Sequence, residues 1–353
     1  MTARSNIRFL LLSLVLWTAA VSCMDYGREE EEDFTRPGSG VFITSEGNFM
    51  AGTATLSYYD PATKEVQNEV FFRANSMKLG DVAQSMAVRD GRGYIAVNNS
   101  GVIFVIDTET FKVLGMIPNL TSPRYIHFVS DEKAYATDLY LPRITVFNPQ
   151  TFQITGFIDT DGHTSTEQMV QHGKYVFTNC WRYDNQILVI DSEKDEVVDS
   201  IRVGIQPTSL ALDRYGKIWT VTDGGYEDSP FGSEAPALYR IDAATRQVEK
   251  TFTFPKGDHS SEVCLNGTAD TLYFLNRSVW RMEVTAERVP VRPFVEDAGT
   301  LYFGLGVDPR SSEVYLADAV DYQQPGVVYR YSPEGELLDQ FRVGVIPGTF
   351  CFK

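Results

Sequence analysis

The chain has 353 residues, a formal net charge of −16 and 43% hydrophobic residues, enough apolar material for a large folded core. A charge of this sign repels phosphate backbones, so nucleic acid is not expected as a partner. The four cysteines, Cys23, Cys180, Cys264 and Cys351, are too few and too scattered to indicate a disulfide framework.

The first residues have the layout of a secretory signal. Arg4 and Arg8 precede an apolar run over 9–20, and small residues then lead to Cys23. This pattern predicts a signal peptide over 1–22, with an apolar run too short to span a bilayer as a mature anchor. A cysteine at this point resembles a bacterial lipobox, which implies lipidation of Cys23. The alternative is an ordinary cleaved signal.

An acidic segment follows, with five consecutive carboxylates over 29–33. Like charges at this density repel one another and do not pack, so residues 23–38 are predicted to be a solvated tether. The segment is similar to the acidic export signal of Bacteroidetes lipoproteins. That similarity implies the cell-surface side of the outer membrane, and the alternative is a plain spacer. Residues 39–353 are then the folded domain.

Within that domain a nine-residue phrase recurs seven times at a mean period of about 45 residues, which is typical of propellers and other repeat arrays. The copies lie at 58–66, 105–113, 146–154, 189–197, 240–248, 281–289 and 330–338. The third position of the phrase is usually Asp, Asn or Ser, and a proline follows it in three copies. These residues favour a tight turn, so each phrase predicts a β-hairpin.

Two more strands are predicted before each hairpin. The nearer ones lie at 41–44, 94–97, 134–137, 175–178, 218–221, 272–275 and 314–317. The earlier ones lie at 85–88, 126–129, 169–171, 209–212, 262–265, 303–307 and 349–352. The first repeat lacks an initial strand while the chain ends on a spare one. We therefore predict an all-β fold, a seven-bladed β-propeller of four-stranded antiparallel blades, in which the C-terminal strand completes the first blade.

The sequence pattern of alternating strands and turns resembles that of the YncE-like propellers with YVTN repeats, most clearly over 174–221. This resemblance implies the propeller fold. It does not imply one function, because propellers carry many activities.

Binding residues are expected on the face that carries the longer loops. The aromatic candidates there are Phe49, Tyr140, Trp181, Tyr183, Tyr226 and Trp280. The polar candidates are Arg124, Asp138, Asp223, Asp318, His163 and His259. The alternatives are that some aromatics fold down over the scaffold and that the aspartates only cap their own loops.

The sequence contains no phosphate-binding loop, nucleophile elbow or zinc-protease motif, so we predict a binding protein that is not an enzyme and has no cofactor. No metal site is predicted either. A weaker alternative is a metal-dependent, lactonase-like hydrolase that uses Asp138, Asp223 and Asp318.

The lipoprotein start, acidic tether and divergent repeats together resemble the BtuG-like surface lipoproteins of gut Bacteroidetes. The resemblance implies capture of cobalamin (vitamin B12) and its transfer to a TonB-dependent transporter in the outer membrane. Flat aromatics beside polar acceptors suit a corrin ring fringed with amides, and they equally suit sugars. A surface glycan-binding or adhesion propeller is therefore the alternative function.

Overall fold

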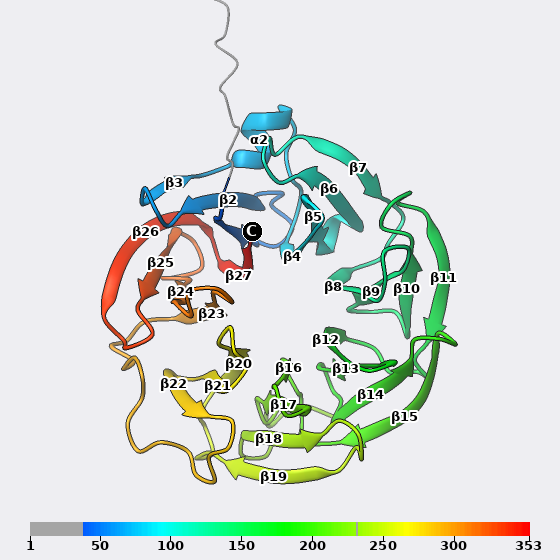
Figure 1. Ribbon diagram of the computed structural model, residues 1–353, viewed down its shortest axis with the longest axis vertical. Helices are drawn as coiled ribbons and strands as arrows, with labels where there is room; N and C mark the ends of the chain where they lie inside the picture. The colour runs from blue at the N-terminus through cyan, green and yellow to red at the C-terminus, as the bar shows by residue number, and fades with distance from the viewer. Residues whose placement is uncertain (1–37, 231) are drawn as a thin grey trace, which may run out of the picture. The chain divides into compact units, whose positions relative to one another are not determined.

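The computed structural model describes residues 38–353 except residue 231. The predicted signal peptide, the lipidation site Cys23 and residues 23–37 of the tether lie outside the described residues. In the described part, the strands form seven sheets arranged around a central axis (Figure 1). The predicted seven-bladed propeller is confirmed. No helix of this part is long and apolar enough to cross a membrane.

The strands fall into four concentric sets. The innermost strands are β27 (Pro347–Phe352), β4 (Ala83–Arg89), β8 (Pro123–Phe128), β12 (Thr166–His172), β16 (Ala211–Leu212), β20 (Ser260–Leu265) and β23 (Tyr302–Val307). The second strands are β1 (Val41–Ser45), β5 (Arg92–Val97), β9 (Ala134–Asp138), β13 (Tyr175–Cys180), β17 (Lys217–Thr222), β21 (Thr271–Asn276) and β24 (Val314–Asp318). The third strands are β2 (Thr55–Asp60), β6 (Val102–Asp107), β10 (Arg143–Phe147), β14 (Gln186–Asp191), β18 (Ala237–Asp242), β22 (Ser278–Glu283) and β25 (Pro325–Tyr331). The outer strands are β3 (Glu65–Gln67), β7 (Val113–Ile117), β11 (Ile154–Asp159), β15 (Glu196–Arg202), β19 (Val248–Thr253) and β26 (Leu337–Val345).

The repeated phrase forms its hairpins through the side chain at its third position. Asp60 Oδ1 accepts a hydrogen bond from the Ala62 amide at 2.8 Å. The equivalent oxygens of Asp107, Asn148, Asp191, Asp242 and Ser332 likewise accept from amides two or three residues later. A short polar side chain can reach its own turn in this way, which is why these residue types recur there.

The C-terminal strand closes the ring as predicted. β27 pairs antiparallel with β1, in a register that sets Phe352 opposite Val41 and Cys351 opposite Phe42. Phe350 packs in a core cluster with Val41, Tyr315 and other residues of the first and last blades. Closure therefore gives β1 a hydrogen-bonded partner on its inner edge and buries apolar surface between these blades.

Blade six departs from the predicted four strands, because within the described residues its sheet contains only β20, β21 and β22. The outer position is taken by an irregular segment, 284–301, which meets β22 at a single bridge between Val279 and Val295. Pro290 and Pro293 lie in this segment and lack the amide hydrogen that a regular outer strand donates.

The core lies between neighbouring blades, where side chains of facing sheets form separate clusters, such as the one around Trp219, Phe252 and Phe274. Two short elements were not predicted. A short helix, α2 (Val70–Asn75), follows β3, and its Asn75 amide group donates to the backbone oxygens of Phe71 and Phe111. A 3-10 turn, η1 (Asn98–Ser100), follows β5.

Candidate functional site

The innermost strands bulge at the same height around the axis. In β8, Arg124 and Tyr125 lie opposite the single residue Thr137, and in β12, Glu167 and Gln168 lie opposite Asn179. Register shifts at equivalent places occur in β4, β20, β23 and β27. A bulge inserts an extra residue and changes the direction of its side chain. The fold therefore presents a ring of side chains at one level of the axis.

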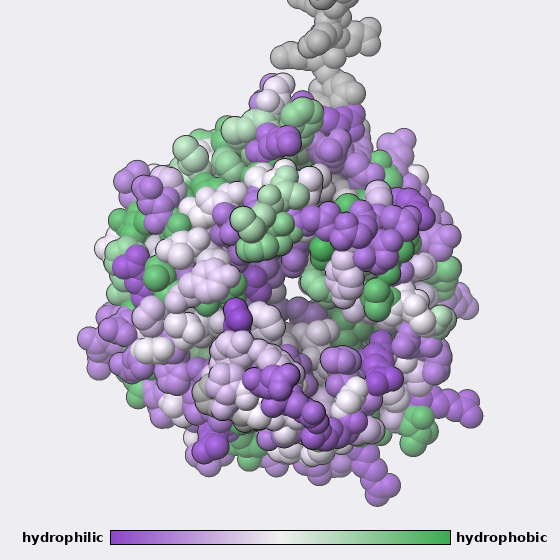
Figure 2. Space-filling model, turned by 180° about the vertical axis from the view of Figure 1, so that it is seen from behind, coloured by the Kyte–Doolittle hydropathy of each residue, from purple (hydrophilic) through white to green (hydrophobic). Residues whose placement is uncertain are grey.

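These side chains line a cavity of about 690 Å³ at the mouth of the axial opening. Figure 2 shows such an opening at the centre of one face of the ring. The cavity wall consists of bulge residues, of residues from the loops that follow the second strands and of residues from the segments that lead into the inner strands. Among them are Glu46, Gln84, Arg124, Tyr125, Glu167, Trp181, Asp223, His259, Glu262, Arg277, Phe303 and Tyr322. Its size and its mixture of aromatic and polar groups are those of a small-molecule site.

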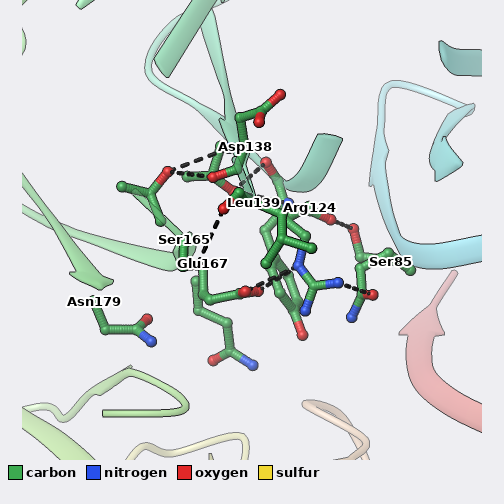
Figure 3. A network of polar contacts seen from close by, with 12 residues as sticks. Ser85, Arg124, Asp138, Leu139, Ser165, Glu167 and Asn179 are labelled. Carbon is green, nitrogen blue, oxygen red and sulfur yellow. Dashed lines mark hydrogen bonds and ion pairs between the residues drawn. The ribbon is translucent and has the colours of Figure 1, made fainter. Parts of the chain in front are cut away.

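A buried ion pair fixes one side of the cavity. Arg124 Nε donates to both Glu167 oxygens at 2.9 and 2.8 Å, and its Nη1 donates to the Gln84 side-chain oxygen. The two charged side chains are 14% and 3% exposed. Figure 3 shows the guanidinium of Arg124 directed at Glu167, with Ser85 donating to the Arg124 backbone oxygen at 2.5 Å. This arrangement holds both charged groups in one orientation.

Two other carboxyl groups of the cavity, those of Glu262 and Glu46, have pKa values that burial raises. Burial raises the pKa of Glu262 to about 8, although the Gln168 amide donates to this carboxyl at 3.1 and 3.2 Å. Burial, reinforced by the charge of Glu167 and opposed by that of Arg124, raises the pKa of Glu46 to about 7. The cavity therefore gains negative charge as the pH rises through the neutral range.

Aromatic side chains lie on the loops after β13 and β17, and one of them, Trp181, lines the cavity. The Trp181 indole donates to Asp223 at 3.2 Å, and the Gln206 amide donates to the same carboxylate at 3.0 Å. Beside them, the Tyr226 hydroxyl donates to the Tyr183 hydroxyl at 2.5 Å, with the ring centroids 6.1 Å apart. Tyr226 is 47% exposed. Trp181 offers an aromatic face to a ligand in the cavity, and the two tyrosines add aromatic surface on the same loops.

The sequence matches the family model described as Domain of unknown function (DUF5074) over residues 39–344. The chain belongs to this DUF5074 family. No curated protein matches the sequence.

Solved structures share the fold of this DUF5074 chain at low sequence identity. A quinonprotein alcohol dehydrogenase-like protein from Bacteroides thetaiotaomicron has a TM-score of 0.67 at 14% identity, over 88% of this chain and 77% of that one. Kuenenia stuttgartiensis hydrazine synthase has a TM-score of 0.57 at 17% identity, over 70% and 76%. The computationally designed Ika8 protein has a TM-score of 0.59 at 13% identity, over 85% and 86%. At these identities the likeness concerns the fold alone.

Four of the residues proposed from the sequence of this DUF5074 chain line the cavity: Arg124, Trp181, Asp223 and His259. Tyr183 and Tyr226 form the pair described above and do not line the cavity itself. Phe49 and Tyr140 are 63% and 52% exposed and do not line the cavity. His163 lies on a neighbouring loop, where its Nδ1 is 2.7 Å from Asp184.

Three proposed residues have structural partners instead. Trp280 was expected to stack on a ligand, but it packs against Phe274 in the core between blades and donates to the Asn276 backbone oxygen. Asp138 accepts backbone hydrogen bonds from Ser122, Tyr140 and Leu141, and Asp318 accepts one from Val320. The two aspartates cap their own loops and do not line the cavity.

The sequence did not single out Glu167 or Tyr125 as cavity residues. Both were missed because, in a regular strand, only one of two consecutive side chains points towards the axis. The bulges of β8 and β12 change that alternation. The one available signal was polar residues at the start of apolar inner strands.

Proposed function

We propose that this chain is a cell-surface lipoprotein that binds cobalamin and passes it to a TonB-dependent transporter of the outer membrane. The observation that carries the binding proposal is the axial cavity lined by Trp181 and Asp223, with the Tyr183–Tyr226 pair on the same two loops. The surface location and the transporter are proposed from the predicted lipobox, the acidic tether and the resemblance to BtuG-like proteins.

The chemistry of the cavity matches a corrin ligand in two respects. A corrin is a broad, partly apolar disc, and aromatic faces bury such a surface while freezing few torsions. Its rim carries amide groups, which are donors and acceptors at once. Around the cavity, Glu46, Glu262 and Asp223 provide carboxyl oxygens as acceptors, while Arg124 and Arg277 provide donors.

A titration with cyanocobalamin tests the proposal. The purified soluble chain, beginning at residue 24, should change the corrin absorbance and lose tryptophan emission as the vitamin is added. If neither signal changes at micromolar cyanocobalamin, the proposed function is wrong.

Substitution of the aromatic cluster locates the binding surface. We expect Trp181→Ala, and separately the double variant Tyr183→Ala/Tyr226→Ala, to weaken binding about tenfold or more, because buried aromatic anchors dominate such interfaces. Tyr215→Ala is the matched control. Tyr215 is a 58% exposed tyrosine near Arg214, in the turn between β16 and β17 at the other end of the strands. An equal loss in the control variant would contradict the proposed position.

The glycan-binding alternative uses the same aromatic surface, since sugar rings also stack on Trp and Tyr. A competition experiment distinguishes the two proposed functions. An excess of a mixed oligosaccharide library should leave cyanocobalamin binding unchanged if the site is specific for the corrin. The hydrolase alternative loses two of its three candidate residues, because Asp138 and Asp318 cap their own loops.

A further inference from the structure

Three metal-ligating side chains converge beside the cavity, on loops at the junction of the third and fourth blades. His163 lies between β11 and β12, Cys180 ends β13, and Asp184 lies in the loop after it. One donor atom from each lies within 4.8 Å of the other two. From this juxtaposition we propose that His163, Cys180 and Asp184 bind a divalent transition-metal ion of the zinc class.

The donor set selects the class of metal. One nitrogen, one sulfur and one carboxylate oxygen are the ligands that zinc accepts in proteins, whereas calcium and magnesium take oxygen almost exclusively. A thiolate and a carboxylate together carry two negative charges, which a divalent ion neutralises. This compensation matters because Cys180 is fully buried and the Asp184 side chain is only 15% exposed.

The backbone already holds the three ligands near coordinating positions. Cys180 lies opposite Thr166 in the β12–β13 ladder, and the Trp181 amide donates to the Ser165 backbone oxygen at 2.8 Å. The His163 backbone amide donates to the Thr160 backbone oxygen, and the Asp184 backbone oxygen accepts from the Gln206 backbone amide at 2.8 Å. Tetrahedral zinc ligands lie roughly 3.3–3.5 Å apart, so side-chain shifts of about 1 Å complete the site.

The metal would replace the present contact between the His163 ring and Asp184, which are 2.7 Å apart. Coordination requires a thiolate and a neutral imidazole, so binding releases the proton of the Cys180 thiol to solvent. Three protein ligands leave a fourth position for water or an exogenous ligand. The His163 side chain is 31% exposed, so this ligand lies at the solvent side of the site.

Cobalt(II) chloride is the probe, because a thiolate ligand gives Co²⁺ an intense near-ultraviolet charge-transfer band. The protein is the tag-free chain beginning at residue 24, which omits Cys23 and is titrated without any corrinoid. We expect one equivalent of Co²⁺ to produce the band and Zn²⁺ to abolish it by displacement. Failure of cobalamin binding would not affect this result.

The variants assign the ligands. Cys180→Ser should abolish the charge-transfer band, and His163→Ala and Asp184→Asn should each weaken Zn²⁺ affinity by at least about tenfold. Cys351→Ser is the matched control, because it removes another buried thiol far from the cluster in sequence. If Cys180→Ser does not fold, His163→Ala and Asp184→Asn still test the site. No band at excess Co²⁺, or a band that persists when Cys180 is replaced, would overturn the proposal.

Discussion

Arg124 and Glu167 illustrate how single residues shape the cavity. Each neutralises the charge of the other in the axial cavity. Both lie in β-bulges, which cannot be recognised from the alternation of apolar residues in the sequence. The turn residues of the repeated phrase present the opposite case. Asp60 and Asp107 make local bonds, so their role could be predicted from a few neighbouring residues. Local chemistry was predictable at the residue scale, and the inward direction of side chains was not.

Removal of one member of the ion pair should destabilise the fold. Arg124→Ala leaves the Glu167 carboxylate buried without its partner, and we expect a loss of about 3–5 kcal/mol in the free energy of unfolding. Urea denaturation measures this loss. The double variant Arg124→Ala/Glu167→Gln should recover part of it, because the unpaired charge is gone. A double variant no more stable than Arg124→Ala would contradict this electrostatic explanation.

Glu262 should make stability depend on pH. Its ordinary pKa of 4.5 is raised to about 8 by burial. Between these values the folded chain keeps a proton that the unfolded chain releases, so its stabilising contribution is present at low pH and lost as the pH rises through 8.

Glu262→Gln should therefore match the parent near pH 5 and exceed it at pH 9, by about 1–3 kcal/mol after allowance for solvent in the cavity. Thermal melts of both proteins across this range measure the difference. The same substitution at exposed Glu132 is the control. A stability difference that does not change with pH would show that Glu262 is not the titrating group.

At the scale of elements, periodicity predicted the inner, second and third strands and the pairing of the terminal strand with β1. Helix α2 was missed because it has only six residues, too few for a helical repeat, and is held by Asn75 and by burial of Val70 and Phe71. The irregular segment 284–301 was missed because its phrase, 281–289, still has the spacing of a hairpin. Its third residue, Glu283, departs from the short Asp, Asn or Ser of the other copies.

Truncation of the closing strand tests its role. Removal of residues 349–353 deletes Phe350 from the cluster between the first and last blades and exposes the inner edge of β1. We expect a loss of about 3–5 kcal/mol or more and a tendency to aggregate, measured by thermal melting and light scattering. Removal of Lys353 alone is the control. A truncated chain that stays monomeric and melts like the parent would contradict the closure argument.

The described part of the molecule is a ring whose blades are not equally regular. Blade six lacks a regular outer strand among the described residues, and its segment 284–301 makes few ladder hydrogen bonds. Hydrogen exchange should therefore be faster over 284–301 than over the outer strand β15 of blade four. Equal protection of the two segments would mean that side-chain packing, for example of Phe294 on Tyr273, compensates for the missing strand.

The pairing of β27 with β1 also determines when the first blade can fold during synthesis of the chain. Residues 41–45 are synthesised long before residues 347–352, so the first blade stays incomplete until this late segment is available. Until then, β1 lacks its hydrogen-bonded partner β27 on its inner edge. The partly synthesised domain therefore keeps an exposed strand edge until β27 can pair with β1, and the first blade folds late.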